Sequence, residues 1–293
     1  MTPAGPGPGE DVWLTDAAIG RLRALADHPD FSGTRYDVIE RIGSGGMGLV
    51  FRGHDRELDR DVAIKVTAYA TDADAERLRT EARTLARLEH PGIVAVHDVG
   101  RLPDGRVFTV MMLVRGERLD VRAARVALAD RLRLFDRVCD AVSFAHDQGI
   151  VHGDLKPANI MVGAHGEVLV VDWGGGRTAG YAAPESSQQR ADARVDVYAL
   201  GRILHDLLPD AGGRSLRPLR SIVGHASDAD AAARYPTVAD LAADVRRFMD
   251  GGAVAAHRES MGERAARLVR TYRTPIALVL AYLVMRALLL MAG

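Results

Sequence analysis

The chain contains 293 residues, of which 47% are hydrophobic, and its formal net charge is −1 at pH 7. This length allows a two-lobed globular core, and the near-neutral charge excludes a general electrostatic affinity for nucleic acid. Cys139 is the only cysteine, so the chain can form no internal disulfide and has no cysteine motif for a metal. The helical apolar pattern around Cys139 predicts a packing role in a reducing compartment.

The N-terminal region is predicted to precede the main domain. Residues 1–10 are rich in Gly and Pro and lack the basic start and apolar core of a secretory signal, which indicates a disordered leader. Residues 11–30 carry apolar positions at helical spacing, which begin after Thr15 and stop at His28-Pro29. We expect this amphipathic helix to pack on the first lobe, with docking or dimerisation as the alternative.

A glycine-rich turn follows the first predicted strand. Residues 36–66 have the pattern of three strands, and the first turn reads Gly43-Ser44-Gly45-Gly46-Met47-Gly48-Leu49-Val50. Missing side chains there let backbone amides approach phosphate oxygens. The residues after Gly48 continue as a returning strand, whereas a dinucleotide-binding fold requires a helix at that point. By itself the turn could be a flexible hairpin tip, but Val62-Ala63-Ile64-Lys65 then places a lysine on the third strand.

A helix is predicted over residues 72–88, with Glu81 within it. By itself Glu81 would be an ordinary exposed helix residue. Two strands and two helices are expected next, near residues 93–100, 107–113, 121–127 and 129–148. The last helix should stop at Gly149, a typical residue after a helix C-terminus.

The stretch with the most chemical information joins two apolar runs and reads His152-Gly153-Asp154-Leu155-Lys156-Pro157-Ala158-Asn159. Asp154 could orient and deprotonate a hydroxyl, and Lys156 could balance charge on a phosphate. Asn159 offers a carbonyl oxygen to a hard cation such as Mg²⁺. A second acidic loop, Asp172-Trp173-Gly174, follows the apolar strand expected over residues 168–171. We expect the two loops to face one site.

In this order the motifs resemble those of the protein kinase family, whose usual patterns are His-Arg-Asp-Leu-Lys-Pro-x-Asn and Asp-Phe-Gly. Residues 178–185 resemble its peptide-positioning segment, in which Glu185 has Arg234 as its partner. The run from Asp196 to Gly201 resembles the buried helix that anchors the catalytic loop. The resemblance spans residues 36–251. It implies an α+β, two-lobed protein-kinase-like fold, with a small β-rich N-lobe over 36–114 and a mainly helical C-lobe over 115–251.

The resemblance also implies a role for each matching residue. ATP and Mg²⁺, which Mn²⁺ could replace, are the implied cofactors, and Ser or Thr hydroxyls of proteins are the implied acceptors. Asn159 and Asp172 match the metal ligands. The implied catalytic residues are Asp154, Lys156, Thr178 that bridges them, Lys65 and its helix partner Glu81. The implied nucleotide-binding residues are Ile42, Gly43, Ser44, Gly45, Gly46, Gly48, Val50, Ala63, Lys65, Met111, Met112, Val114, Asn159 and Asp172.

Three departures from the family pattern bear on regulation. Gly153 replaces the Arg that pairs with a phosphorylated activation loop in regulated members. Trp173 replaces the usual Phe, and the segment between Gly174 and Pro184 is far shorter than usual. Because the loop and its arginine are lost together, we expect activity that does not require phosphorylation of this segment.

Two other functions stay open at this point. The His-Gly-Asp and Asp-Trp sequences are also similar to the catalytic loops of small-molecule phosphotransferases of the aminoglycoside and choline kinase type. A pseudokinase scaffold that binds nucleotide without transfer is the other alternative. Lys156, Thr178 and the Ala-Pro-Glu sequence over 183–185 favour a bacterial Ser/Thr protein kinase over the first. The presence of Asp154 and Asp172 gives the second no support.

The end of the chain predicts a basic linker and a C-terminal apolar helix. Residues 252–274 carry an arginine cluster, and residues 275–292 are apolar except for Arg286. A stretch of this length is just enough to cross a bilayer, although a central arginine costs about 2.5–3.5 kcal/mol. We expect a single span of the inner (cytoplasmic) membrane with the kinase-like domain in the cytoplasm. The alternatives are an interfacial helix, an oligomer contact or a packed terminal helix. The sequence indicates no oligomeric state.

Overall fold

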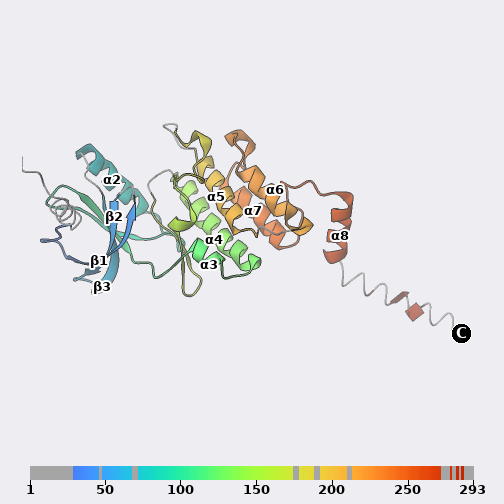
Figure 1. Ribbon diagram of the computed structural model, residues 1–293, viewed down its shortest axis with the longest axis horizontal. Coiled ribbons are helices and arrows are strands. Elements are labelled where there is room, and N and C mark those ends of the chain that lie inside the picture. Colours follow the sequence, from blue (N-terminus) through green and yellow to red (C-terminus); the bar gives the residue numbers. More distant parts are fainter. Residues whose placement is uncertain are drawn as a thin grey trace, which may run out of the picture. The chain divides into compact units, whose positions relative to one another are not determined.

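The computed structural model describes residues 29–45, 48–67, 72–173, 178–187, 192–209, 213–271, 278, 282–283 and 285–286. Their contacts divide them into two units (Figure 1). The first unit contains the described residues up to Arg83 together with Val96–Leu113. The second contains Thr84–Ala95 and the described residues from Val114 onward.

The first unit is built on an antiparallel sheet, with α2 (Asp72–Leu85) following its third strand. Its five strands, in the order β1-β2-β3-β5-β4, are β1 (Tyr36–Gly45), β2 (Gly48–Asp55), β3 (Arg60–Thr67), β4 (Val96–Arg101) and β5 (Val107–Met112). Side chains alternate between faces along a strand, so Val62, Ile64 and Val66 of β3 share one face and enter the core. The predicted strands are present, although the one expected near residues 93–100 begins at Val96, and the helix ends at Leu85, before the predicted end at residue 88.

The core of the first unit begins before the predicted start at Tyr36. Phe31 is 8% exposed and packs edge-on against Phe108, with 5.0 Å between the ring centroids. Residues 31–35 therefore belong to this unit. The predicted leader over residues 1–10, and the predicted amphipathic helix up to residue 28, lie outside the described residues.

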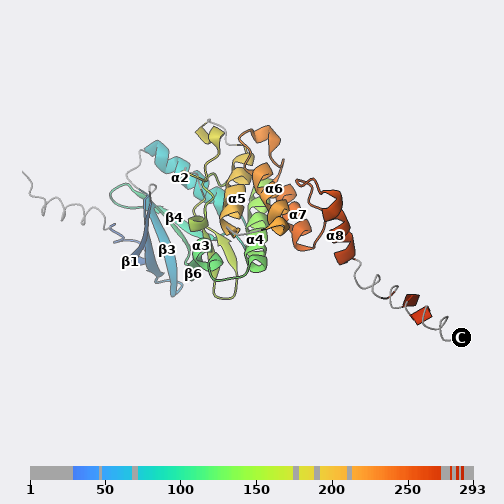
Figure 2. The ribbon, with the colours of Figure 1, turned by 45° about the vertical axis from the view of Figure 1, so that its right-hand side comes forward.

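The second unit is mainly helical, and α4 to α7 pack side by side around one apolar core (Figure 2). Its helices are α3 (Leu119–Ala123), α4 (Leu128–Asp147), α5 (Arg194–Leu207), α6 (Arg217–Ala226), α7 (Val238–Met249) and α8 (Met261–Thr271). Along α4, Phe135, Val138, Cys139 and Val142 recur at helical spacing and are fully buried. The predicted packing role of Cys139 is confirmed.

A small sheet in the second unit carries the two loops of interest. Its strands are β6 (Gly116–Arg118), β7 (Ile160–Gly163) and β8 (Val168–Val170). Residues 84–95 pack in this unit, because Ile93 is buried in its core and Val170 exchanges backbone hydrogen bonds with Gly92 and Val94. The sequence had grouped residues 84–95 with the first lobe, so the observed division differs there.

The fold continues past the predicted domain end at Gly251. Val254 is 5% exposed and belongs to the core of the helical unit. Asp244 of α7 is buried, and its carboxylate accepts the backbone N–H groups of Ala255 at 2.8 Å and Ala256 at 2.9 Å. These bonds fasten the chain after α7 to the helical bundle.

Residues 252–271, predicted as part of a basic linker, are ordered by specific contacts. The Ser260 backbone N–H and hydroxyl donate to Glu263, and the Glu263 N–H donates back to the Ser260 hydroxyl, which forms a capping box at the start of α8. Arg267 donates two hydrogen bonds to Glu259 at 2.8 and 3.0 Å. The structure therefore has a docked turn and a helix where the sequence predicts a linker.

Most of the predicted C-terminal apolar helix over residues 275–292 lies outside the described residues. The structure describes Leu278, Tyr282, Leu283, Met285 and Arg286 of that stretch. Among the residues described, no helix is both long and apolar enough to span a membrane.

Replacing Asp244 by Ala should lower the free energy of unfolding by about 2–4 kcal/mol, because the variant leaves the N–H groups of Ala255 and Ala256 without their acceptor. The hydroxyl of Tyr235 and the guanidinium of Arg247 lose the same acceptor. Urea denaturation of the full chain measures the loss. Asp250→Ala, at an exposed position just after α7, is the control.

Stability should also respond to acid. Burial alone raises the pKa of Asp244, but the hydrogen bonds from Ala255, Ala256, Arg247 and Tyr235 together lower it below its ordinary value. A carboxylate of this kind stabilises the fold above its unfolded pKa, and that contribution is lost as the pH falls through the folded pKa. An Asp244→Ala chain as stable as the Asp250→Ala chain at pH 7 would contradict this account.

Candidate active site

A buried carboxylate fixes the start of the loop over residues 152–159. Asp196, in the first turn of α5, is fully buried. It accepts the backbone N–H groups of His152 at 2.8 Å and Gly153 at 2.9 Å, and it lies 2.8 Å from His146 Nε2. The helix N-terminus favours the negative charge at this position. Gly153 has a φ of +78°, a conformation that glycine adopts without strain. Asp196 thus holds the loop on α5, which confirms the predicted anchoring helix.

His152 connects this loop with the acidic loop at Asp172. The imidazole is fully buried, with Nδ1 accepting the Asp154 N–H at 3.2 Å and Nε2 lying 3.1 Å from the Val171 carbonyl oxygen. Because Nδ1 is an acceptor, Nε2 carries the proton and donates to Val171. Burial lowers the pKa of His152. The ring is therefore neutral, with one defined tautomer.

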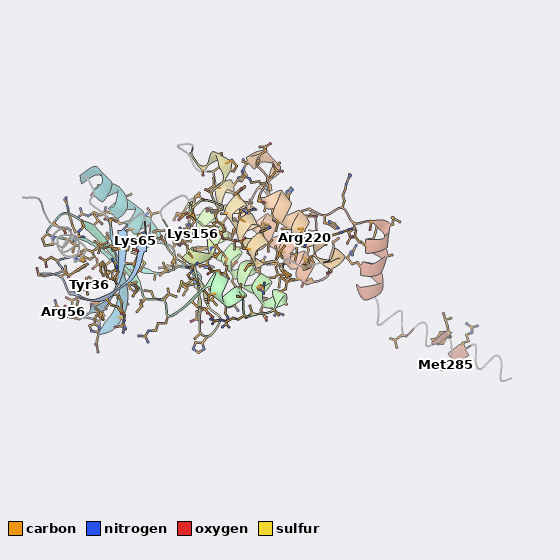
Figure 3. The ribbon with its side chains drawn as sticks, viewed as in Figure 1. Tyr36, Arg56, Lys65, Lys156, Arg220 and Met285 are labelled. Atoms are coloured by element: carbon orange, nitrogen blue, oxygen red, sulfur yellow. The ribbon has the colours of Figure 1, made fainter. Side chains whose placement is uncertain are left out.

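Asp154, Lys156 and Thr178 form a closed set of hydrogen bonds. Lys156 Nζ donates to Asp154 Oδ2 at 2.6 Å and to Thr178 Oγ1 at 2.7 Å, and the Thr178 hydroxyl donates to Asp154 Oδ1 at 2.7 Å. The Asp154 side chain is 9% exposed and that of Lys156 is 23% exposed. Both carboxylate oxygens of Asp154 are thus oriented, and the ammonium group of Lys156 lies next to one of them. Lys156 is labelled in Figure 3. Thr178 thus makes hydrogen bonds to both Asp154 and Lys156.

Asn159 links the same loop to the segment before Asp172. The side-chain N–H of Asn159 donates to the backbone carbonyl oxygen of Asp154 at 2.9 Å, and the backbone carbonyl oxygen of Asn159 accepts the Val171 N–H at 2.9 Å. The remaining atom of the side-chain amide, Oδ1, has the chemistry of a magnesium ligand. Asp172, which follows Val171, has a φ of +62°. The structure thus joins the Asn159 and Asp172 segments through a backbone bond.

Asn159 and Asp172 suit Mg²⁺ better than a metal ion whose ligands are all protein side chains. Within the described ranges, no cluster of three His, Cys, Asp or Glu side chains could hold a metal ion. Mg²⁺ needs only one or two such ligands, because it keeps waters and phosphate oxygens in its coordination shell. Asn159 and Asp172 both supply the hard oxygen that Mg²⁺ prefers.

The short segment before Glu185 is held by α5. Arg202 Nε donates to the Gly180 carbonyl oxygen at 3.0 Å, and the Tyr181 hydroxyl donates to Asp206 at 2.6 Å. Burial, and next the bond to Asp206, raise the pKa of Tyr181 to about 12. The tyrosine therefore stays a donor at neutral pH.

A buried ion pair closes the far end of this segment. Arg234, whose side chain is fully buried, donates to both oxygens of Glu185 at 2.6 and 2.8 Å. Its guanidinium also lies over the ring of Tyr198, 4.9 Å from the centroid. The predicted Glu185–Arg234 pair is confirmed. A small cavity next to Asp154 is lined by Gly153, Asp154, Leu155, Tyr181, Ala182, Ala183, Ser186, Val195 and Ala199.

Five of the predicted nucleotide-binding residues of the first unit lie on one face of its sheet: Gly43, Val50, Ala63, Lys65 and Met111. Gly43 pairs with Val50, and Val50 pairs with Lys65 across β1, β2 and β3. Ala63, two residues before Lys65, pairs with Met111 of β5. Because paired residues share a face and alternate residues along a strand do too, this face lies opposite the apolar core. Lys65 is labelled in Figure 3.

The other predicted nucleotide-binding residues are placed by the backbone. Ile42 is 48% exposed on β1, and Met112 ends β5. Val114 is partly buried at the start of the second unit. Ser44 pairs with Leu49, and Gly45 with Gly48, at the hairpin end. A Cβ at Gly48 would lie within 2.0 Å of the Val66 carbonyl oxygen, so only glycine fits there. The side chain of Glu81 and residue Gly46 lie outside the described part of the structure, although the backbone of Glu81 belongs to α2.

Sequence reasoning missed the contacts of Arg202 and Asp206. Tyr181 and Asp206 are 25 residues apart, and neither belongs to a motif whose spacing could indicate the pair. The indole of Trp173 was noted only as a departure, yet its Nε1–H donates to the Val170 carbonyl oxygen.

A sequence model of the protein kinase domain matches residues 36–212. The chain belongs to the protein kinase family. The match begins at β1 and ends after α5, so it includes both the strand lysine and the loop around Asp154.

Several curated protein kinases are similar to this chain. The serine/threonine-protein kinase PknB of Mycolicibacterium smegmatis is 37% identical over 207 residues, covering 61% of this chain and 33% of that protein. PknB of Mycobacterium tuberculosis is 33% identical over 276 residues, covering 76% of this chain and 44% of that protein. PknA of Mycobacterium tuberculosis is 36% identical over 212 residues, covering 62% of this chain and 49% of that protein. The chain thus spans between a third and a half of the length of these relatives.

The neutral state of His152 can be observed directly. Because burial lowers its pKa, its imidazole should stay neutral, with the proton on Nε2, when the pH falls to values at which an unstructured histidine is protonated. Nitrogen-15 NMR of the histidine side chains, with a short histidine peptide as the reference, measures both states. A His152 ring that takes up its second proton together with the peptide would contradict the assigned hydrogen bonds.

Proposed function

We propose that this chain is a Mg²⁺-dependent protein kinase that transfers the γ-phosphoryl group of ATP to Ser or Thr hydroxyls of proteins. The observation that carries the proposal is the closed set formed by Asp154, Lys156 and Thr178, which orients a carboxylate beside a cation. The relatives, named serine/threonine-protein kinases, support the acceptor class.

Asp154 has the central role in the proposed transfer. It would accept the hydrogen bond of the acceptor hydroxyl and orient its oxygen toward the γ-phosphorus. A bond forms between that oxygen and the γ-phosphorus while the bond from phosphorus to the β–γ bridging oxygen breaks, so ADP leaves and the hydroxyl proton passes to Asp154. Lys156 would balance the negative charge on the moving phosphoryl group, and Thr178 would keep Asp154 and Lys156 in place.

The remaining residues would bind the nucleotide and metal. Asn159 and Asp172 would hold Mg²⁺, which when bound neutralises charge on the phosphates. Lys65, paired with Glu81, would bind the α- and β-phosphates beneath the glycine-rich turn over residues 43–48. Contacts with the adenine would come from Ile42, Val50, Ala63, Met111, Met112 and Val114.

We also propose that the short segment before Glu185 needs no phosphate to be active. In regulated kinases a phosphorylated loop is held by arginines. Here the same part of the chain is bound by side chains of α5, through Arg202 to Gly180 and through Tyr181 to Asp206. In the part of the segment that the structure describes, residues 178–185, these bonds form without a phosphate, and Gly153 provides no side chain to bind one.

For the end of the chain we propose membrane attachment through residues 275–292, with the kinase domain on the cytoplasmic side. The apolar sequence and the arginines that precede it support this. Residues 1–10 would be a disordered leader and residues 11–28 an amphipathic helix, which ends before the non-helical Pro29 and Asp30.

The test is transfer from γ-labelled ATP by the full chain. With Mg²⁺, the chain should label protein acceptors on Ser or Thr, and Asp154→Ala should reduce the rate by about 10²–10⁴-fold. ATP binding by Asp154→Ala should stay nearly unchanged. Asp147→Ala, at an exposed position on α4, is the control. Label on aminoglycosides or choline alone would favour a small-molecule phosphotransferase. ATP binding without any transfer would favour a pseudokinase, and either result would overturn the proposal.

The same assay examines independence from phosphorylation. The chain is treated with a protein phosphatase until its intact mass shows no phosphate, and the phosphatase is removed. It should then start transfer at the full rate without a lag. A lag that ends as phosphate appears between residues 174 and 185 would contradict the proposed mode of control.

A further inference from the structure

The outer row of helix α6 is basic. Arg217 and Arg220 are exposed there, and Gly224, one turn after Arg220, is exposed in the same row. Residues 213–226 contain no Asp or Glu. Arg220 is labelled in Figure 3. The helix therefore presents a positive strip to solvent.

The turn before α8 lies against this strip. Ser221, the residue after Arg220, has its Oγ 3.0 Å from His257 Nδ1. Arg258 follows His257 and is exposed. Because Ser221 also lies one turn after Arg217, this contact places the backbone of Arg258 beside the two arginines of α6.

The acidic residues of the turn and of α8 are already paired within that part of the chain. Glu263 accepts the capping hydrogen bonds of Ser260. Glu259 accepts two hydrogen bonds from Arg267, which lower the pKa of Glu259, and the nearby charge of the exposed Arg264 lowers it further. Residues 252–271 contain no other Asp or Glu. The surface formed by α6 and residues 257–267, which we call the α6–α8 surface, therefore carries a net positive charge.

Large apolar side chains are exposed from the start of α8 onward. Met261, in its first turn, is 83% exposed. Beyond α8, four more large apolar side chains are each more than half exposed: Leu278, Tyr282, Leu283 and Met285. Exposed apolar side chains beside basic residues are typical of a surface that binds a membrane. The basic α6–α8 surface thus continues directly into exposed apolar sequence.

We infer that the α6–α8 surface rests on the phosphate-bearing headgroups of anionic lipids. The inference rests on the membrane attachment proposed for residues 275–292, and adds to it a surface of the folded unit and a class of lipid. Arginine suits this role, because its guanidinium can donate two parallel hydrogen bonds to a phosphate. An acidic protein segment could meet the same charges, but it would leave the exposed apolar residues after α8 without a partner. Contact through α6 would hold the second unit in one orientation on the lipid surface.

Energy transfer from a dye on α6 to the lipid surface tests the inference. Gly224→Cys supplies the attachment point, since a Cβ there meets no atom of another element within 4 Å and Cys139 is buried. The full chain is mixed with vesicles whose headgroups carry the acceptor dye. These vesicles contain either phosphatidylcholine alone or equal amounts of phosphatidylcholine and phosphatidylglycerol. Transfer should be strong on the anionic vesicles, weak on the neutral ones, and reduced by high salt, which screens exposed charges. Equal transfer on both kinds of vesicle would overturn the inference.

Matched arginine substitutions assign the effect to this surface. In the double variant Arg217→Gln with Arg220→Gln, the preference for anionic over neutral vesicles should fall about 10- to 30-fold, because each arginine near an anionic surface contributes roughly 5-fold. The control, Arg125→Gln with Arg133→Gln, removes two exposed arginines outside the surface and should keep the preference. An equal loss of preference in both double variants would contradict the assignment.

A second double variant examines the other half of the surface. Arg258→Gln with Arg264→Gln should lower the preference for anionic vesicles to a similar extent, since both side chains are exposed. Thermal unfolding shows whether each variant is folded. If one double variant has a folding defect, the other decides, and an unchanged preference in that folded variant would overturn the inference.

The outcomes separate this inference from the proposed function. A chain that floats with both kinds of vesicle and shows equal energy transfer would keep the attachment through residues 275–292 and overturn the surface. Binding to anionic vesicles alone, lost in Arg217→Gln with Arg220→Gln, would support the surface and contradict insertion of residues 275–292. If phosphatidylglycerol has no effect but a polyglutamate peptide binds through Arg217 and Arg220, the surface takes an acidic protein segment and the inference is overturned. Phosphoryl transfer is measured without vesicles, so its loss would leave the lipid result standing.

Discussion

The arrangement of the active-site loops depends on one buried carboxylate. Asp196 has no exposed surface, and three nitrogen atoms surround it: the backbone nitrogens of His152 and Gly153 and the imidazole of His146. A buried charge of this kind is favourable only when its donors stay in place. The same constraint that satisfies Asp196 therefore fixes the start of the loop that carries Asp154.

From Asp196 the contacts continue outward in a definite order. His152 in turn forms a hydrogen bond to Val171 through Nε2 and packs against the ring of Trp173. Asn159 binds the same segment through its backbone. The acidic loop and the catalytic loop are thus parts of one hydrogen-bonded structure, and a change in one is expected to disturb the other. Two of the three departures in this chain, Gly153 and Trp173, lie within that structure.

Much of the fold and of the candidate site could be predicted from the order of the residues in the sequence. The alternation along β3 predicts which side chains enter the core, and the ordered motifs predicted that Thr178 bridges Asp154 and Lys156 and that Glu185 pairs with Arg234. Those inferences succeed because each residue belongs to a motif whose chemistry requires the others. Arg234 could be assigned although it is 49 residues from Glu185.

Other features have no such signal. Val254 is one apolar residue in a stretch rich in Gly and Ala. Nothing in the local sequence therefore indicates that Asp244 binds this stretch to the helical bundle through Ala255 and Ala256. The grouping of residues 84–95 with the helical unit depends on Ile93 pairing with Val170, an isolated β-bridge between residues far apart in the sequence. The bonds of Arg202 and Asp206 to the short segment depend on where α5 ends in space. These features arise from tertiary packing, which residue patterns do not contain.

The measurement that tests the central role of Asp196 most directly is amide hydrogen exchange at His152 and Gly153. In the unaltered chain both amides should exchange only through large-scale unfolding, because they are bound to a buried acceptor. In Asp196→Asn their exchange should become at least about tenfold faster than in the Asp147→Asn control, since the charged acceptor is lost. If both amides keep full protection in Asp196→Asn, then the loop is held by something other than this carboxylate.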